Sequence, residues 1–230
     1  MTTDAAALNE IIQSLHEQVA LLASAAQIEP PERSDLRDEL VRNQLLRAAE
    51  ILRGAAVLGS AQNAICLGIV SRSLLELLIS SLWLVRSIEN ASAHQSAARA
   101  ELAKALRLNL EAGKAKIKER ATGKDVTVEF LETEQMKKPA RRLSVEQQAK
   151  EADVLDIYTV FYRFMSLETH GHSESPQSAS DIRELCEVHL QGIGAVSRAI
   201  GQVCVWWLMH RSWPDNESIR KVLGLNSEKP

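Results

Sequence analysis

Residues 64–85 read AICLGIVSRSLLELLISSLWLV and form one of the two most apolar stretches of the sequence. Arg72 and Glu76 interrupt this stretch near its centre. The other apolar stretch, residues 190–209, carries Arg198 near its own centre. Charges in the middle of a membrane span are costly and rare. We therefore interpret both stretches as core helices and expect no membrane association.

The composition of the chain favours helices throughout. Apolar residues make up 45% of the 230 residues, enough for a sizeable core, while aromatic residues make up only 4%. Ala and Leu dominate, and side chains such as Leu lose little rotamer freedom in a helix. The sequence therefore predicts an all-α fold, a single-domain up-and-down bundle of about six helices over residues 1–230.

Prolines and turn residues divide this bundle into segments. Helices are expected at residues 4–27, 35–58, 61–89, 96–120, 144–169 and 179–211. Residues 121–143 are expected to form a connecting loop with a brief extended piece. Residues 214–230 are expected to form a weak C-terminal tail.

The first predicted helix has a narrow apolar seam. Its apolar side chains recur at alternating spacings of four and three residues: Leu8, Ile12, Leu15, Val19, Leu22 and Ala26. Such a seam can pair with another helix or with another subunit. Residues 1–30 are therefore a candidate surface for a homodimer.

Charge, cysteine content and the N-terminus limit the functions and compartments that the sequence allows. The formal net charge of −3 argues against a general nucleic-acid coat protein, so any RNA contact must be local. The three cysteines, Cys66, Cys186 and Cys204, show no CxxC spacing, which is typical of small buried side chains in a reducing compartment. The N-terminus lacks the basic and apolar regions of a secretory signal, so we expect a cytoplasmic protein.

The Arg72 and Glu76 pair is the clearest departure from the apolar pattern. Both project on the side of the helix that also carries four large apolar side chains, Ile65, Ile69, Ile79 and Trp83. Removing two charges from water is costly, so function or specificity explains the pair better than stability does. The alternative is a pair at the rim of the bundle, with aliphatic stems on the core and charged heads in water.

A second unusual run, residues 157–175, reads IYTVFYRFMSLETHGHSES. On a helix, Tyr162, Arg163, Ser166 and His170 would share an arc of about 100°. Arg binds phosphate, His titrates near neutrality, and Ser or Tyr can orient a reacting oxygen. This set predicts phosphodiester cleavage without a metal, with His170 as general acid or base and Arg163 stabilising charge on phosphorus. The alternative is an ordinary polar helix face whose terminal His complements the helix dipole.

The same run invites a metal interpretation. Two histidines two residues apart in a turn, flanked by Glu168 and Glu174, are not a full ligand set. A bundle site built from Glu76, Glu168, His170 and His172 is the further alternative. We expect no metal and no other cofactor.

Two fragments carry a resemblance to known families. RSLLELLISSLWL, with Arg72 and Glu76, and YRFMSLETHGHS, with Tyr162, Ser166 and His170, resemble an uncharacterised bacterial helical family with R-x-x-x-E and Y-x-x-x-S-x-x-x-H helices. Arg163, six intervening residues and His170 are also similar to the R-x(4-6)-H signature of the HEPN superfamily. That superfamily contains compact helical bundles, among them metal-independent ribonucleases of toxin and phage-defence systems.

The HEPN resemblance implies a homodimer in which two Arg–His elements face each other across a cleft. It makes Arg163 and His170 the expected catalytic pair of a bacterial stress or phage-defence protein that binds and cleaves RNA. The expected supporting residues are Arg72, Glu76, Tyr162, Ser166 and His172. A cluster of four cations in six residues provides candidate RNA contacts: Lys137, Lys138, Arg141 and Arg142.

The rival hypothesis is a non-catalytic helical binding or interaction module. In that protein Arg72 and Glu76, together with Ser166 and His170, would form a buried polar network that fixes helix register. RNA, a second copy of the chain and a further partner protein are the binding partners to test.

Overall fold

A computed structural model describes residues 3–29, 34–133, 143–162, 178–212 and 214–225. Within these residues every regular element is helical, and the only β pairing is an isolated bridge between Lys118 and Asp125. The all-α prediction is therefore confirmed. The chain divides into two compact units, residues 1–87 with 145–230 (unit 1) and residues 88–144 (unit 2).

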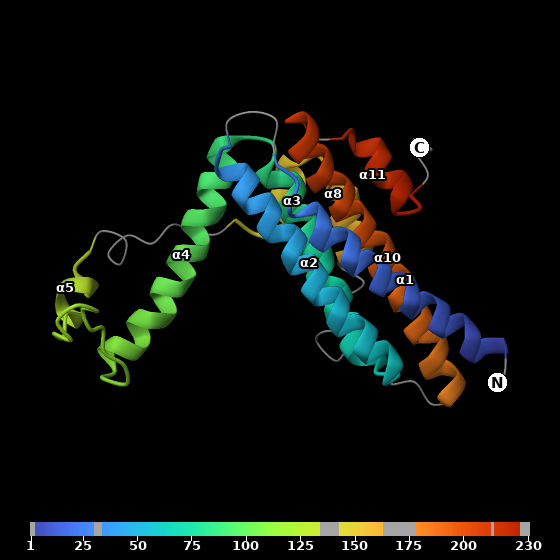
Figure 1. Ribbon diagram of the computed structural model, residues 1–230, viewed down its shortest axis with the longest axis horizontal. Helices are drawn as coiled ribbons and strands as arrows, with labels where there is room; N and C mark the ends of the chain where they lie inside the picture. The colour runs from blue at the N-terminus through green and yellow to red at the C-terminus, as the bar shows by residue number, and fades with distance from the viewer. Residues whose placement is uncertain (1–2, 30–33, 134–142, 163–177, 213, 226–230) are drawn as a thin grey trace. The chain divides into compact units, whose positions relative to one another are not determined.

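Four long helices form the body of unit 1 (Figure 1). They are α1 (Thr3–Ala25), α2 (Leu36–Ser60), α3 (Ala64–Leu84) and α10 (Ala179–His210). Helix α2 begins at a capping box in which Asp35 and Asp38 satisfy each other's backbone N–H groups. Helix α10 begins at an equivalent box made by Ser178 and Asp181. Both starts lie within one residue of their predicted positions.

The direction of α10 differs from the predicted up-and-down alternation. At one end of α2, a Cβ atom on Gly59 would lie 2.9 Å from Leu190, in the first half of α10. At the other end of α2, Asp38 contacts Trp207, near the end of α10, so these two helices are antiparallel. Helix α3 is also antiparallel to α2, because only a short turn joins them. Helices α3 and α10 consequently run in the same direction, and the chain between them must travel back along the bundle.

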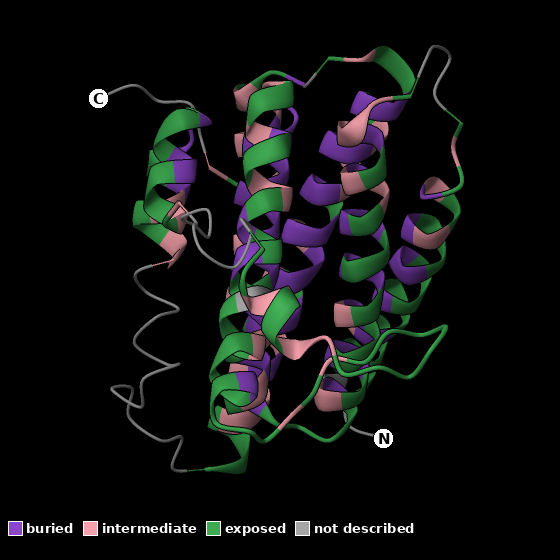
Figure 2. Ribbon diagram, turned by 90° about the vertical axis from the view of Figure 1, so that its left-hand side faces the viewer, coloured by how far each residue is buried: buried purple, intermediate pink, exposed green. Residues whose placement is uncertain are grey.

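The apolar seam of α1 is buried inside unit 1. All six seam residues are at most 8% exposed, and α1 packs against α2 and α10. Figure 2 shows that buried residues gather on the sides of the long helices that face other helices. The seam therefore pairs with helices of its own chain and offers no surface to a second subunit. A homodimer stays a prediction, but its interface cannot be this seam.

Helices α3 and α10 are long and apolar enough to cross a membrane. Their most apolar windows have mean hydropathies of 1.7 and 1.2, and 61% and 56% of those windows are buried inside the structure. Core helices of water-soluble bundles have the same composition and the same burial. The cytoplasmic location stays a prediction.

The predicted helix over residues 144–169 is wrong in its described part. Helix α7 (Val145–Glu151) ends at a turn in which Asp153 has a φ of 57°, and α8 (Leu155–Ile157) follows. A wide π-helical turn, η1 (Tyr158–Tyr162), comes next. The carbonyl oxygen of Ala152, which this break exposes, accepts hydrogen bonds from Arg86 (2.6 Å) and Asn216 (3.2 Å). These donors are more than 60 residues away along the chain, so local periodicity could not reveal them.

The weak tail is in part a docked helix, α11 (Asn216–Val222). It begins at Asp215, whose carboxylate accepts a hydrogen bond from the backbone N–H of Ser218 (2.8 Å). Arg220 of α11 pairs with Asp156 of α8 at 2.7 Å, which lowers the pKa of that carboxyl. Helix α11 therefore contacts α8 and helps to hold the interrupted segment after α7 in place.

Unit 2 contains α4 (Ile88–Glu111) and the short α5 (Thr127–Leu131). Helix α4 begins eight residues earlier and ends nine residues earlier than predicted. Gly113 follows its end with a φ of 67°, a conformation that favours glycine and terminates helices. Residues 117–126 then fold back on themselves, with the backbone N–H of Val126 donating to the carbonyl of Ile117 (2.8 Å). A hairpin-like loop thus stands where the last turns of a helix were predicted.

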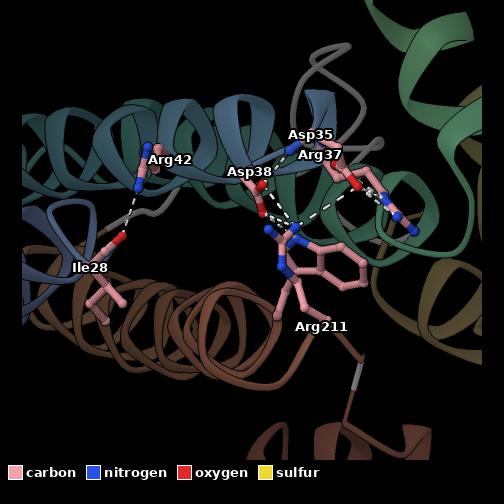
Figure 3. Close-up of polar contacts among 7 residues, drawn as sticks. Ile28, Asp35, Arg37, Asp38, Arg42 and Arg211 are labelled. Carbon is pink, nitrogen blue, oxygen red and sulfur yellow. Dashed lines mark hydrogen bonds and ion pairs between the residues drawn. The ribbon is translucent and has the colours of Figure 1, made fainter. Parts of the chain in front are cut away.

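A buried carboxylate joins the start of α2 to the end of α10 (Figure 3). Asp38, whose side chain is 1% exposed, accepts hydrogen bonds from Nη1 of Arg211 at 2.7 and 2.8 Å. Its other donors are Nε1 of Trp207 (3.1 Å) and the backbone N–H of Asp35 (2.6 Å). Arg37 lies over the Trp207 ring at 4.4 Å. The carboxylate is fully satisfied, as burial of a charge requires.

Replacing Asp38 with Ala should unfold the protein more easily, because Arg211 would lose the carboxylate that balances its partly buried charge. We expect the free energy of unfolding to fall by about 3–5 kcal/mol, the range for breaking a buried ion pair. Urea denaturation followed by circular dichroism measures the change. Glu39→Ala, at the exposed neighbouring position, is the matched control and should cost no more than about 0.5 kcal/mol. Equal effects of the two substitutions would contradict this role of Asp38.

Candidate functional site

Three of the residues that the sequence singled out come together in unit 1. Arg72 and Glu76 lie on α3, and Tyr162 lies at the end of η1. Tyr162 is 90 positions from Arg72 and 86 from Glu76 along the chain, yet its hydroxyl is in direct contact with polar atoms of both. We call these three residues the Arg72–Glu76–Tyr162 cluster.

The Tyr162 hydroxyl is the centre of the cluster. It accepts a hydrogen bond from Nη2 of Arg72 (2.7 Å) and donates one to Oε1 of Glu76 (3.0 Å). Nε of Arg72 also donates directly to Oε1 of Glu76, at 3.3 Å. A phenol can donate once and accept as well, so Tyr162 matches a cation on one side and an anion on the other.

Ring contacts add to these hydrogen bonds. The Arg72 guanidinium lies 4.7 Å from the centroid of the Tyr162 ring, within the range of a cation–π interaction. Tyr158, one turn earlier, stacks on Tyr162 with ring centroids 4.7 Å apart and an interplanar angle of 22°. Sequence reasoning did not identify Tyr158, because its stacking depends on the local π-helical geometry.

The cluster is neither fully buried nor freely solvated. The side chains of Arg72 and Glu76 are 19% and 32% exposed. On the same helix face, Ile79 and Trp83 are buried towards one end, whereas Ile65 and Ile69 are 58% and 42% exposed towards the other. The pair therefore lies where the core meets the surface. This location is intermediate between the two alternatives that the sequence left open, a pair removed from water and a pair at the rim of the bundle.

Burial and the two charges change the acidity of the cluster. Burial raises the pKa of Tyr162 above its ordinary value, and the Glu76 carboxylate adds to the increase, while Arg72 opposes it. Partial burial alone would lower the pKa of Arg72, but the Tyr162 hydroxyl and Glu76 outweigh it and raise that pKa. The Tyr162 phenol therefore stays neutral at neutral pH, and it lies between the Arg72 guanidinium and the Glu76 carboxyl group.

A second contact holds the chain before η1 against α3. Nε1 of Trp83 donates to Oε2 of Glu151 at the end of α7, at 2.6 Å. Trp83 was predicted as an apolar neighbour of the ion pair, and it is 3% exposed. Its polar partner could not be recognised, since no sequence motif joins positions 68 residues apart.

The remaining predicted site residues lie outside the described residues. These are Arg163, Ser166, His170 and His172, the candidate RNA contacts Lys137, Lys138, Arg141 and Arg142, and Glu168 and Glu174 of the metal alternative. Within the part of the chain that the structure describes, no group of three or more His, Cys, Asp or Glu side chains is placed to hold a metal ion. Glu76, the one described member of the metal alternative, pairs with Arg72 and Tyr162.

The three cysteines carry free thiols. Cys186 and Cys204 are buried, and Cys66 is half-buried. Burial raises the pKa of the Cys204 thiol to about 12, although Ser81 opposes the shift. The Cys204 thiol therefore packs as an unreactive apolar group, as the sequence predicted for the cysteines.

Replacing Tyr162 with Phe should destabilise unit 1, because a hydroxyl that serves two charged groups is lost. We expect about 1–2 kcal/mol, the usual value for hydrogen bonds to charges reduced by solvent screening. The raised pKa of Tyr162 means that this stabilisation is complete below about pH 10, where a free tyrosine ionises, and is lost as the pH rises through the folded-state value. Thermal unfolding of both proteins between pH 7 and pH 11 measures the difference.

Tyr158→Phe is the matched control for this substitution. The Tyr158 hydroxyl makes no hydrogen bond among the described residues, and the stacked ring would be retained. We expect a change within about 0.5 kcal/mol. A stability difference between wild type and Tyr162→Phe that does not shrink at high pH would show that the hydroxyl acts otherwise.

The comparison with known proteins places these residues in a family. No curated protein and no solved structure matches the chain. The model of a family of unknown function, DUF5677, matches residues 38–182. This range is well over half of the chain and contains Arg72, Glu76 and Tyr162. The chain therefore belongs to the family of unknown function DUF5677.

Proposed function

We propose that the chain is a HEPN-like protein of bacterial stress or phage defence that binds RNA and cleaves it without a metal through Arg163 and His170. One observation supports the proposal most. Tyr162, the residue directly before Arg163 in the sequence, is tied to α3 by two hydrogen bonds to charged groups. The chain thus enters the segment that holds both proposed catalytic residues from a fixed point on the bundle.

The reaction would be a transesterification, in which the 2′-hydroxyl of the RNA and not a water molecule is the nucleophile. His170 would act on one oxygen, as base on the ribose 2′-hydroxyl or as acid on the leaving 5′-oxygen, and solvent water would take up or supply the proton at the other. The 2′-oxygen then attacks phosphorus and the bond to the 5′-oxygen breaks, which leaves a 2′,3′-cyclic phosphate and a 5′-hydroxyl. Arg163 would stabilise the negative charge that accumulates on the phosphoryl oxygens.

In this proposal the Arg72–Glu76–Tyr162 cluster positions the catalytic segment and does not touch the substrate. The carboxylate oxygen of Glu76 accepts bonds from both other members of the cluster, and the Tyr162 hydroxyl both donates and accepts. The chemistry is thereby assigned to Arg163 and His170, with Ser166 and His172 as their proposed supports. A homodimer that pairs two such segments would have to use a surface other than the α1 seam.

The second candidate is a non-catalytic helical binding or interaction module. It is favoured by the mutual satisfaction of a cation, an anion and a phenol within a partly buried cluster. A network of that kind fixes the register of packed helices without any chemistry. A partner protein would then be the ligand, and Ser166 and His170 would extend the network.

The test incubates the full chain with total RNA in the presence of EDTA and reads fragments with 2′,3′-cyclic phosphate ends. We expect cleavage by wild type and a loss of about 100-fold or more in His170→Ala, the usual contribution of a general acid or base. Arg163→Ala should lose activity similarly. His16→Ala, at an exposed position on α1, is the matched control and should cleave like wild type.

The outcomes separate the two candidates. RNA binding without cleavage by wild type would contradict the ribonuclease and retain RNA as a ligand. Neither binding nor cleavage would favour the interaction module. Tyr162→Phe provides a further distinction, because a positioning role predicts reduced cleavage with an unchanged pH profile, whereas a catalytic hydroxyl would alter the profile.

A further inference from the structure

The two units of the chain carry opposite net charge. Residues 88–144 contain twelve Lys and Arg against eight Asp and Glu, a net charge of +4. The rest of the chain contains fifteen Lys and Arg against twenty-two Asp and Glu, a net charge of −7. The overall charge of −3 therefore conceals a basic unit within an acidic protein.

Part of this basic charge lies on the hairpin-like loop that follows α4. Around the Lys118–Asp125 bridge, the backbone N–H of Glu119 donates to the carbonyl of Lys124 (2.8 Å), and that of Val126 donates to Ile117 (2.8 Å). Hydrogen bonding at alternate residues is the pattern of an antiparallel ladder. Residues 117–119 are therefore extended and paired with residues 124–126.

Cations recur at every second position of this segment. In an extended chain, successive side chains point to opposite faces, so residues two apart share a face. Residues 114–120 read KAKIKER, with cations at every second position: Lys114, Lys116, Lys118 and Arg120. All four are exposed, whereas the intervening Ala115 and Ile117 are half-buried. Only residues 117–119 are paired as extended chain, while Lys114 lies in the bend after α4 and Arg120 in the turn of the loop. Glu119 is exposed as well, so this row of charges carries four exposed cations and one exposed anion.

Only some of these cations are neutralised. Lys116 pairs with Asp125 at 3.5 Å. Hydrogen bonds from Thr127 and the charge of Lys116 lower the pKa of Asp125, so this carboxylate braces the loop in its ionised form. Lys114, Lys118 and Arg120 have no ion-pair partner among the described residues. Three exposed cations therefore remain available to an anionic ligand.

We infer that Lys114, Lys118 and Arg120 bind the phosphate backbone of single-stranded RNA. This inference rests on the proposed RNA-binding function and assigns it a surface that differs from the predicted contacts Lys137, Lys138, Arg141 and Arg142. An acidic protein fits less well, because stable protein interfaces need buried aromatic or apolar anchors. The row contains no aromatic residue, and its one large apolar side chain, Ile117, is half-buried within the loop. Cations alone suffice for phosphates, since their binding releases counterions.

Binding of this kind has defined properties. Contacts with phosphates hold the RNA in place but read no base, so the loop would bind different RNA sequences with similar affinity. Affinity would fall steeply with salt concentration. Base selection and cleavage would then belong to other residues, in line with a separate catalytic segment in unit 1.

The test measures binding of a labelled 30-nucleotide single-stranded RNA of mixed sequence to the full chain. All proteins carry His170→Ala, so that the RNA stays intact. In this background, K114E/K118E/R120E should weaken binding about tenfold or more at 0.1 M salt, and the slope of log affinity against log salt should become shallower by about 2 units, for three lost phosphate contacts. K114Q/K118Q/R120Q should give the same change in slope with a smaller loss of affinity, which separates lost contacts from repulsion.

A matched control reverses three exposed cations of unit 1, as R47E/K150E/K221E, with the same change in net charge. This control should retain the wild-type slope, and circular dichroism should show unchanged helix content in every variant. If the control weakens binding as much as the unit 2 variant, or if neither does, the assignment of this surface is overturned while RNA binding stands. If the unmodified His170→Ala chain binds no RNA, the proposed function fails, and this inference fails with it.

Discussion

An ion pair on the most apolar helix of the bundle constrains the rest of unit 1. Arg72 and Glu76 stand at the boundary of the core, where charges must be hydrogen-bonded to be tolerated. Their direct contact, at 3.3 Å, is longer than either hydrogen bond that Tyr162 makes with them. Tyr162 therefore bridges the two charges more closely than they contact each other. Helix α3 thereby fixes the position of η1, the turn that follows α8.

Similar polar contacts act at the end of the bundle where α2 begins and α10 ends. Asp38 joins these two helices through Arg211 and Trp207, and the broken segment after α7 is held by Arg86, with Asn216 on α11. Apolar stripes are enough to form and bury the long helices. They do not specify how far one helix is shifted or rotated relative to its neighbour. The polar contacts supply that specificity. They also explain why the interrupted helical segment over residues 152–162 has one defined path across the surface of α3.

The helices could be predicted from the sequence to the extent that their signals are local. The capping residues Asp35 and Ser178 and the periodic burial of α2 and α10 are local, and both helices match the prediction closely. The break at Asp153 and the π-helical turn depend on donors from Arg86 and α11, so periodicity predicted an uninterrupted helix there. The predicted end of α4 was wrong for a different reason. Gly113 and the two-residue alternation after it were visible in the sequence but were read as helical.

The sequence identified residues of the candidate site but did not reveal which of them contact one another. Arg72 and Glu76 stood out because charges on an apolar face are rare, and Tyr162 because it belongs to a polar arc. That the tyrosine hydroxyl joins the two charges could not be deduced, since 86 to 90 residues separate Tyr162 from the two charged residues. The seam of α1 illustrates the same limit, because its pattern predicts burial but does not distinguish the chain's own α2 and α10 from a second subunit.

Under the proposed function, we expect RNA to contact this protein at two places, the hairpin-like loop of unit 2 and the segment that begins at Tyr162. Photo-crosslinking of 4-thiouridine RNA to the full chain in the His170→Ala background, with mass spectrometry of the linked peptides, tests it most directly. We expect crosslinked peptides from residues 114–124 and from the segment that contains Tyr162 and Arg163. Crosslinks confined to other parts of the chain, such as α1 or α2, or none at saturating RNA, would contradict it.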